Sequence, residues 1–137
     1  MSHITSVAIP IKDIAVAKRA LEALGMDVHE GGTVEVYDGS TVTGDLTVRT
    51  PGTAWSRQKD YGIAFTQTED GLEASADWGA VTGHETMRRF GSQQVFLDAV
   101  GQKYSELLVR DEMTLQGFTL EESEVEGKIV LVGKRYR

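Results

Sequence analysis

The three histidines are the side chains of this sequence that most invite a metal-binding interpretation, because imidazole nitrogens commonly ligate zinc and other transition metals. His84-Glu85 begins like the helical zinc-protease motif, but Arg88 stands where that motif needs its second histidine. His3 and His29 lie far away in sequence and belong to no ligand pattern. The absence of cysteine also excludes thiol catalysis, iron–sulfur clusters and cysteine-ligated zinc. We therefore expect no metal site.

Paired carboxylates are the next candidates, since general acid–base catalysis often uses aspartate and glutamate. Asp111-Glu112, Glu121-Glu122 and Glu69-Asp70 fall on the polar side of a predicted helix, on an acidic strand and in a turn. A catalytic carboxylate needs a concave, partly desolvated site, so solvated charge is the better interpretation of all three pairs. Asp77-Trp78 differs, because a buried aspartate beside an indole can form a hydrogen-bonded pair. The simpler alternative makes Trp78 a core residue and Asp77 a cap or turn residue.

The glycines and basic residues supply no motif for nucleotide or ester chemistry. The sequence has no Walker loop, no Gly-x-Gly-x-x-Gly and no Gly-x-Ser-x-Gly, so we expect no cofactor and name no catalytic residue. Arg88 and Arg89, with Arg57 and Lys59, could form a small site for an anion or an acidic partner. The alternative is a solvated basic patch. A net charge of −7 argues against a general nucleic-acid binder, because such binding depends on Lys and Arg neutralising phosphates.

The stretch from Phe96 to Tyr136 is predicted to form one long amphipathic helix followed by a β-hairpin. Its apolar residues recur at spacings of three and four, so one broad face should be buried along the whole helix. That face comprises Phe96, Leu97, Val100, Tyr104, Leu107, Leu108 and Leu115. Lys103, Glu106, Arg110, Asp111 and Glu112 form the predicted solvated side. Gly117 ends the helix, and Glu126-Gly127 is a two-residue hairpin signal.

The two strands of this hairpin have different compositions. Glu121, Glu122 and Glu124 suit a charged edge strand that resists pairing with other chains. The second strand contains the run Ile129-Val130-Leu131-Val132, which is apolar on both faces and is predicted nearer the middle of a sheet. Its second face needs a cover, either the loop at residues 53–60 or another subunit or partner.

The earlier part of the chain alternates predicted strands with one helix. Residues 3–11 form a strand, Asp13 caps a helix that ends at Gly25, and short strands follow at residues 26–29, 33–37 and 46–50. Residues 61–65 and 72–78 form a hairpin around a turn at residues 69–71. A further helical region at residues 84–90 is interrupted at Gly91-Ser92.

These elements predict an α+β fold: a two-layer sandwich with a mostly antiparallel sheet and two main helices packed on one face. At 137 residues the chain should form a single domain, residues 1–137. It contains no apolar run near the roughly 20 residues of a membrane span and no signal-peptide pattern. We expect a soluble, acidic, cytoplasmic protein.

Several of these segments together resemble a known family, the hypothetical chloroplast reading frame thirty-five family of cyanobacteria, algal plastids and assorted bacteria. The matching segments are Met1-Ser2-His3, Ala23-Leu24-Gly25, Tyr61 to Phe65, Phe96-Leu97, Val100, Gln102-Lys103-Tyr104, Gly117-Phe118 and Gly127 to Leu131. Residues 33–59 are particular to this chain. The family has no established activity, so the resemblance transfers no catalytic residue. Its members are often encoded beside ATPases of the AAA+ type, which implies a partner or adaptor role.

The leading hypothesis is a non-enzymatic interaction module, an accessory or adaptor subunit of a larger assembly, with a protein partner or a homo-oligomer. Its candidate surface residues are Arg57, Lys59, Asp77, Trp78, His84, Arg88, Arg89, Val130 and Val132. The alternative is a small-molecule enzyme or sensor whose pocket lies between the sheet and the loop at residues 53–60, using Asp77, Trp78, His84 and Arg88. A third hypothesis is specific nucleic-acid binding through Arg57, Lys59, Arg88 and Arg89.

Overall fold

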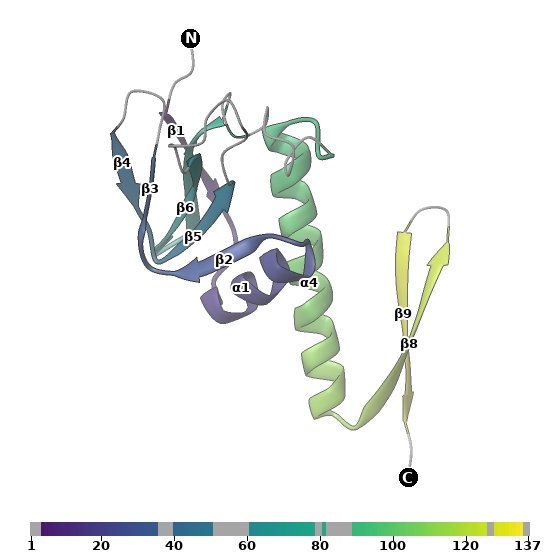
Figure 1. Cartoon of the computed structure of the whole chain (residues 1–137). Coiled ribbons are helices and arrows are strands. Elements are labelled where there is room, and N and C mark those ends of the chain that lie inside the picture. Colours follow the sequence, from purple (N-terminus) through teal and green to yellow (C-terminus); the bar gives the residue numbers. More distant parts are fainter. Residues whose placement is uncertain are drawn as a thin grey trace.

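The computed structural model describes residues 4–35, 40–50, 61–78, 81, 89–125 and 128–135 (Figure 1). In these ranges the chain forms strands on either side of a short helix, then a long helix, then a hairpin. The elements are β1 (Ile4–Ile9), α1 (Ile14–Ala23), β2 (Asp27–Glu30), β3 (Thr33–Glu35), β4 (Thr41–Thr43), β5 (Leu46–Thr50), β6 (Tyr61–Thr68), β7 (Gly71–Asp77), α4 (Gln93–Leu115), β8 (Phe118–Val125) and β9 (Lys128–Arg135).

The main sheet has seven strands and is built around β6. Strand β7 runs along one edge of β6, with β1 outside it, and β5 runs along the other edge, with β2 outside it. Strand β3 meets β6 through one parallel bridge, Glu35 with Tyr61, and pairs with β4. Every other pairing is antiparallel, so the predicted α+β fold with a mostly antiparallel sheet is confirmed.

Both helices pack on the same face of this sheet, as predicted. Helix α1 begins at Asp13, whose Oδ1 accepts hydrogen bonds from the amides of Ala15 and Val16 at 3.0 and 3.2 Å. It ends at Ala23, and Gly25, with φ of +82°, follows its cap residue Leu24. Helix α4 begins after the cap residue Ser92, which confirms the expected break there. The buried helical residues are Val16, Ala17, Ala20, Leu21, Phe96, Leu97, Val100 and Tyr104, and they share one core with Val48, Ile63 and Phe65 of the sheet.

The opposite face of β5 and β6 is covered by the β3–β4 hairpin. Figure 1 shows β3 and β4 on the left and α4 on the right, with β5 and β6 between them. Val34 of β3 and Ala64 of β6 are each 1% exposed. Thr47 is also buried, and its hydroxyl donates to the carbonyl of Gly31 at 2.9 Å. The centre of the sheet is therefore enclosed on both faces.

The C-terminal hairpin forms a separate sheet of two strands, β8 and β9. The predicted helix, its end at Gly117 with φ of +85° and the two strands that follow are confirmed. The expectation that Ile129 to Val132 lies near the middle of a sheet is wrong, because within the described chain β9 pairs only with β8. Figure 1 shows the hairpin standing clear of the main sheet, at the far end of α4.

The prediction that α4 buries its apolar face along the whole helix holds only for the first half. Burial reaches Tyr104, and Leu107 still packs against the core. Leu108 is 39% exposed and Leu115 is 84% exposed. Helix α1 has only 10 residues, whereas α4 has 23, so the end of α4 extends past the surface that could cover it.

Gly62 is the position where the β3–β4 hairpin approaches β6 most closely. A Cβ atom at this residue would lie 2.7 Å from Cγ1 of Val34 and would also overlap the carbonyl oxygen of Val48. We predict that Gly62→Ala lowers the free energy of unfolding by about 1–3 kcal/mol, the usual cost of overpacking. Urea unfolding measures this. The control is Gly101→Ala, in α4, where a Cβ meets no atom within 4 Å and should stabilise by about 0.5–1 kcal/mol. Equal stability of the two variants would contradict the close packing.

Candidate functional site

Four of the predicted site residues lie outside the described ranges: Arg57, Lys59, His84 and Arg88. Asp77 and Trp78 are at the end of β7, and both are buried, at 1% and 7% exposure. Asp77 pairs with Ile4 in the strand ladder, and Trp78 belongs to the hydrophobic core, which agrees with the core interpretation of this tryptophan.

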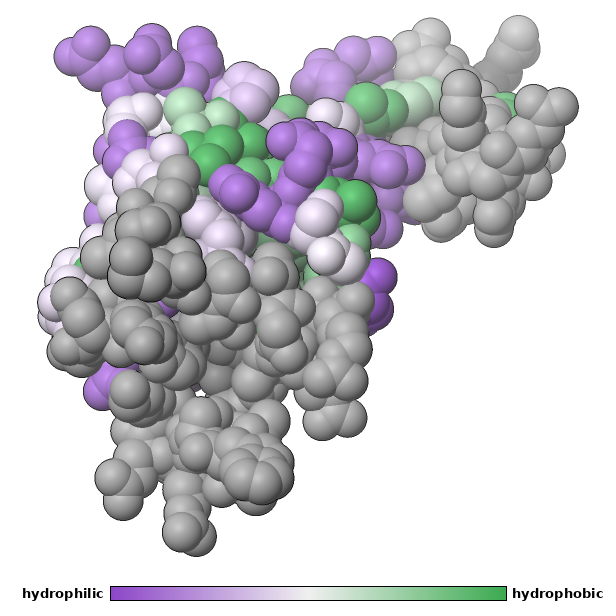
Figure 2. All heavy atoms as spheres, turned by 90° about the horizontal axis from the view of Figure 1, so that it is seen from above, coloured by the Kyte–Doolittle hydropathy of each residue, from purple (hydrophilic) through white to green (hydrophobic). Residues whose placement is uncertain are grey.

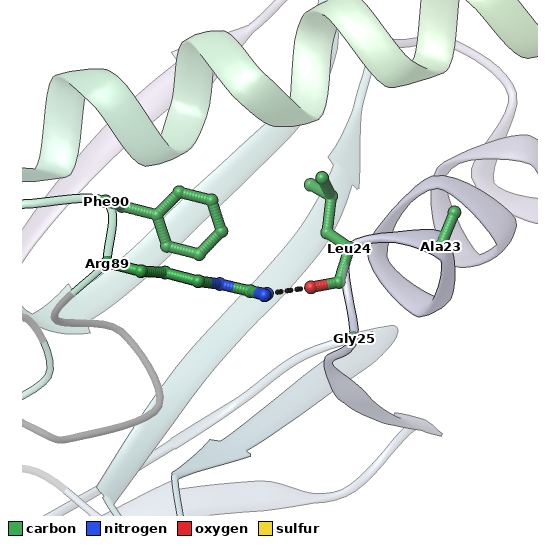
Figure 3. Close-up of a pocket in the computed structure, with 5 residues that line it drawn as sticks. All are labelled: Ala23, Leu24, Gly25, Arg89 and Phe90. Atoms are coloured by element: carbon green, nitrogen blue, oxygen red, sulfur yellow. Dashed lines mark hydrogen bonds between the residues drawn. The ribbon is translucent and has the colours of Figure 1, made fainter.

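Arg89 belongs to the segment just before α4, and its side chain caps the C-terminal end of α1. Its guanidinium donates a hydrogen bond to the carbonyl oxygen of Leu24 and lies over the ring of Phe90, 4.7 Å from the ring centre (Figure 3). Phe90 in turn meets Phe96 edge to face, with ring centres 5.1 Å apart. Ala23 and Gly25 complete the lining of a shallow depression of about 400 Å³. The arginine therefore joins the segment before α4 to the end of α1.

The chemistry available at this depression is limited by the cap itself. The C-terminal end of a helix carries a partial negative charge, which favours the guanidinium but opposes an anionic ligand beside it. Arg89 already uses a donor on the helix carbonyl, and its planar group is held against Phe90. Arg89 therefore makes a capping contact, and the predicted anion site stays a prediction, because Arg57, Lys59 and Arg88 lie outside the described ranges. Sequence reasoning missed this contact because the acceptor is a backbone carbonyl, which no residue pattern reveals.

The most exposed apolar residues of the described chain lie on α4 and the hairpin. Leu108, Val109 and Leu115 are 39%, 46% and 84% exposed, and Val132 of β9 is 46% exposed. We call the three α4 residues Leu108, Val109 and Leu115 the distal surface. Asp111, Thr114 and Leu115 border a shallow depression of about 370 Å³ there. On the face seen in Figure 2, apolar residues lie in patches between hydrophilic ones. Val95, at the start of α4, is exposed to 50% and lies apart from this group.

An ion pair between the two helices lies beside Leu108 and Leu115 on α4. Arg19 of α1 makes two contacts with the carboxylate of Asp111, at 2.7 and 3.3 Å. Its hydrogen bond lowers the pKa of Asp111, and burial opposes that change. This pair joins α1 to the second half of α4, so α4 remains anchored seven residues beyond Tyr104.

Glu106 forms a second charged cluster, with Lys103 and Arg110 at 2.8 and 3.2 Å. Its side chain is only 9% exposed, so the prediction that it lies on the solvated side of the helix is wrong. The hydrogen bond from Lys103 is the main cause that lowers the pKa of Glu106; burial raises this pKa, and Arg110 lowers it further. The carboxylate is paired on its own helix and serves as a local clamp.

A metal centre is not evident in the described ranges, which contain no group of three or more His, Asp or Glu residues that could hold an ion. None of the described helices is both long enough and apolar enough to cross a membrane. What the described chain offers is a two-layer α+β body with an exposed helix-and-hairpin surface.

The chain belongs to the family of proteins of unknown function DUF1257, whose model matches residues 20–132. The matched region begins inside α1 and ends inside β9, so it includes the end of α1, all of α4 and most of the hairpin. No curated protein matches the chain. No solved structure matches it.

Leu108, Val109 and Leu115 were not among the predicted site residues. A helical repeat shows which residues share a face, but it does not show where the covering layer ends. The available signal was the difference in length between the two predicted helices, one of which ends at Gly25 after about ten residues while the other continues to Gly117.

Glu106 provides a test of the charged cluster on α4. Because its pKa is lowered in the folded protein, its pairing stabilises the protein above the ordinary pKa of glutamate and is lost as the pH falls through the lowered value. We predict that Glu106→Gln costs about 1 kcal/mol near neutral pH, from two pairs on one helix, and that this cost shrinks at acid pH as the lowered pKa of Glu106 is passed. Urea unfolding at both pH values measures it, with the exposed Glu22→Gln as control. A cost that does not change with pH would contradict the pairing.

Proposed function

We propose that this protein is a non-enzymatic interaction module that binds a protein partner through the distal surface. The observation that carries the proposal is the 84% exposure of Leu115 at the end of a helix whose first half is buried. A leucine is worth roughly 1.5–3 kcal/mol when fully removed from water, so an ordered exposed leucine is a strong potential contact.

The spacing along α4 supports one continuous contact stripe. Leu108 follows Tyr104 by four residues, and Leu115 follows Leu108 by seven, so all three fall near one line along the helix. Tyr104 is buried, and its hydroxyl accepts a hydrogen bond from the amide of Asp13 at 3.0 Å. The line that faces the core at Tyr104 thus continues without a cover at Leu108 and Leu115.

One ion pair lies beside this stripe, as in an interface rim, whereas the other charged cluster lies on the opposite side of the helix. Arg19 with Asp111, and Glu106 with Lys103 and Arg110, are paired within the chain. Interfaces commonly place such polar groups around a small apolar centre, where a few large side chains supply most of the binding energy. Leu108 and Leu115 supply such an apolar centre, and the paired Asp111 lies beside it.

The role of an accessory or adaptor subunit in the cytoplasm follows from the same proposal. The sequence resemblance to the chloroplast reading frame thirty-five family supports it, because those proteins are often encoded beside AAA+ ATPases. An assembly with such an ATPase would use a docking subunit whose binding residues lie on a projecting element, as Leu115 does here.

The test replaces the two aligned leucines with glutamine. We predict that the double variant L108Q/L115Q loses at most about 2 kcal/mol of stability, since Leu115 is 84% exposed and Leu108 is 39% exposed, but no longer binds its partner. The measurement is thermal unfolding together with quantitative recovery of partners, including untagged copies of the chain, on tagged protein in native extract. Val95→Gln is the matched control, because Val95 is equally apolar and 50% exposed on the same helix. Partner recovery unchanged by L108Q/L115Q would overturn the proposal.

A further inference from the structure

The C-terminal hairpin has two open backbone edges. Within the described chain β8 and β9 pair only with each other, through eight residue pairs from Phe118 with Arg135 to Val125 with Lys128. A two-stranded ribbon is marginally stable by itself in water, and a third strand or a packing surface normally supports it. This hairpin is therefore a strong candidate for pairing with another strand.

The two edges differ in chemical character. Strand β8 carries Glu121, Glu122 and Glu124, charges of the kind that prevent strand addition. Strand β9 contains no charged residue from Ile129 to Gly133 and no proline. The open edge of β9 is thus the one that favours pairing.

The register identifies the backbone groups at that edge. Two residues separate the closing pair Val125 and Lys128, and in such a hairpin the closing pair exchanges its backbone hydrogen bonds. Every second residue pair along the two strands, counted from the closing pair, then also exchanges backbone hydrogen bonds. Ile129, Leu131 and Gly133 consequently present their N–H and C=O groups to the open edge, away from β8.

We infer that β9 pairs antiparallel with the β9 strand of a second copy of this chain; the inference rests on the proposed interaction role. A twofold axis at Val130 places Ile129 opposite Leu131 of the second copy and Lys128 opposite Val132 of the second copy. The result is a four-stranded sheet in the order β8-β9-β9-β8. The acidic strands become the outer edges, and the apolar strands become the inner ones, as the composition of β9 predicts.

The alternatives for this pairing are weaker. A shift of two residues toward the C-terminus places Lys128 opposite Lys134 of the second copy, and like charges directly opposite destabilise a sheet. A shift the other way leaves only three residues of each β9 paired. A one-residue shift would place residues whose N–H and C=O groups point to the open edge opposite residues whose groups point to β8, so they could not form hydrogen-bonded pairs. Symmetric pairing of β9 with β9 also closes on itself, so it yields a dimer and no filament.

Single cysteines test the contact directly, because the chain has none of its own. We expect Val130→Cys to form a disulfide-linked dimer under mild oxidation, since the two Cα atoms would lie about 4.5 Å apart, within the range of a disulfide. The control is Ser123→Cys, at the β8 residue opposite Val130. Its two copies would be three strand spacings apart, about 14 Å, and should not link. The readout is a reductant-sensitive dimer band for the first variant alone.

A second measurement keeps the inference testable without cysteines. Sedimentation should give the wild type twice its 15.0 kDa mass, and Leu131→Pro should give a monomer, because proline removes an edge amide that β8 does not use. Leu131→Ala keeps that amide and should remain a dimer. Circular dichroism checks that all variants fold.

Two results would overturn the inference: a monomeric wild type with no Val130→Cys link, or equal linking by Val130→Cys and Ser123→Cys. If the wild type is monomeric while a different protein is still recovered and lost in L108Q/L115Q, the dimer is refuted and the interaction role stands. If neither copies nor other proteins bind, both proposals fail.

Discussion

The packing of β6 is the constraint on which the rest of this structure depends. Its residues alternate between two buried surfaces, with Ile63 and Phe65 against the helices and Gly62 and Ala64 beneath the β3–β4 hairpin. The small residues allow the hairpin to approach the backbone, while the large ones fill the space under α1 and α4. Strand β6 therefore packs against both the helical layer and the β3–β4 hairpin. A change in side-chain size on either face of β6 would require its neighbours to repack.

The second constraint is the length of α4. Its first half completes the core, where Phe96 and Val100 are buried, and Tyr104 joins it to the start of α1. Beyond that point α4 still contacts α1 through the ion pair of Asp111 with Arg19. A helix that is anchored in this way can hold exposed leucine in a defined position without depending on it for stability.

The elements of the fold were predictable because their signals are local. The cap at Asp13, the left-handed glycines at residues 25 and 117 and the alternation in β6 and β7 each depend on neighbouring residues, and each is confirmed. The features that were predicted wrongly depend on residues that are distant in the sequence. Whether Leu115 is covered depends on where α1 ends, and whether β9 is central depends on which strands reach it. The capping contact of Arg89 with Leu24 spans 65 residues and ends on a carbonyl, so no side-chain pattern announces it.

Because α4 is one uninterrupted helix, its length sets both how far the hairpin lies from the sheet and the direction in which it points. Between Tyr104 and Leu115 the helix advances about 17 Å, and each residue turns whatever follows by about 100°. A single inserted residue in this segment would rotate the hairpin by more than a quarter turn and aim the edge of β9 elsewhere, whereas seven residues would restore its direction to within about 20° while moving it about 10 Å outward. The second half of α4 thus serves as a spacer of fixed direction, and in the proposed dimer the number of its turns would set the separation of the two copies.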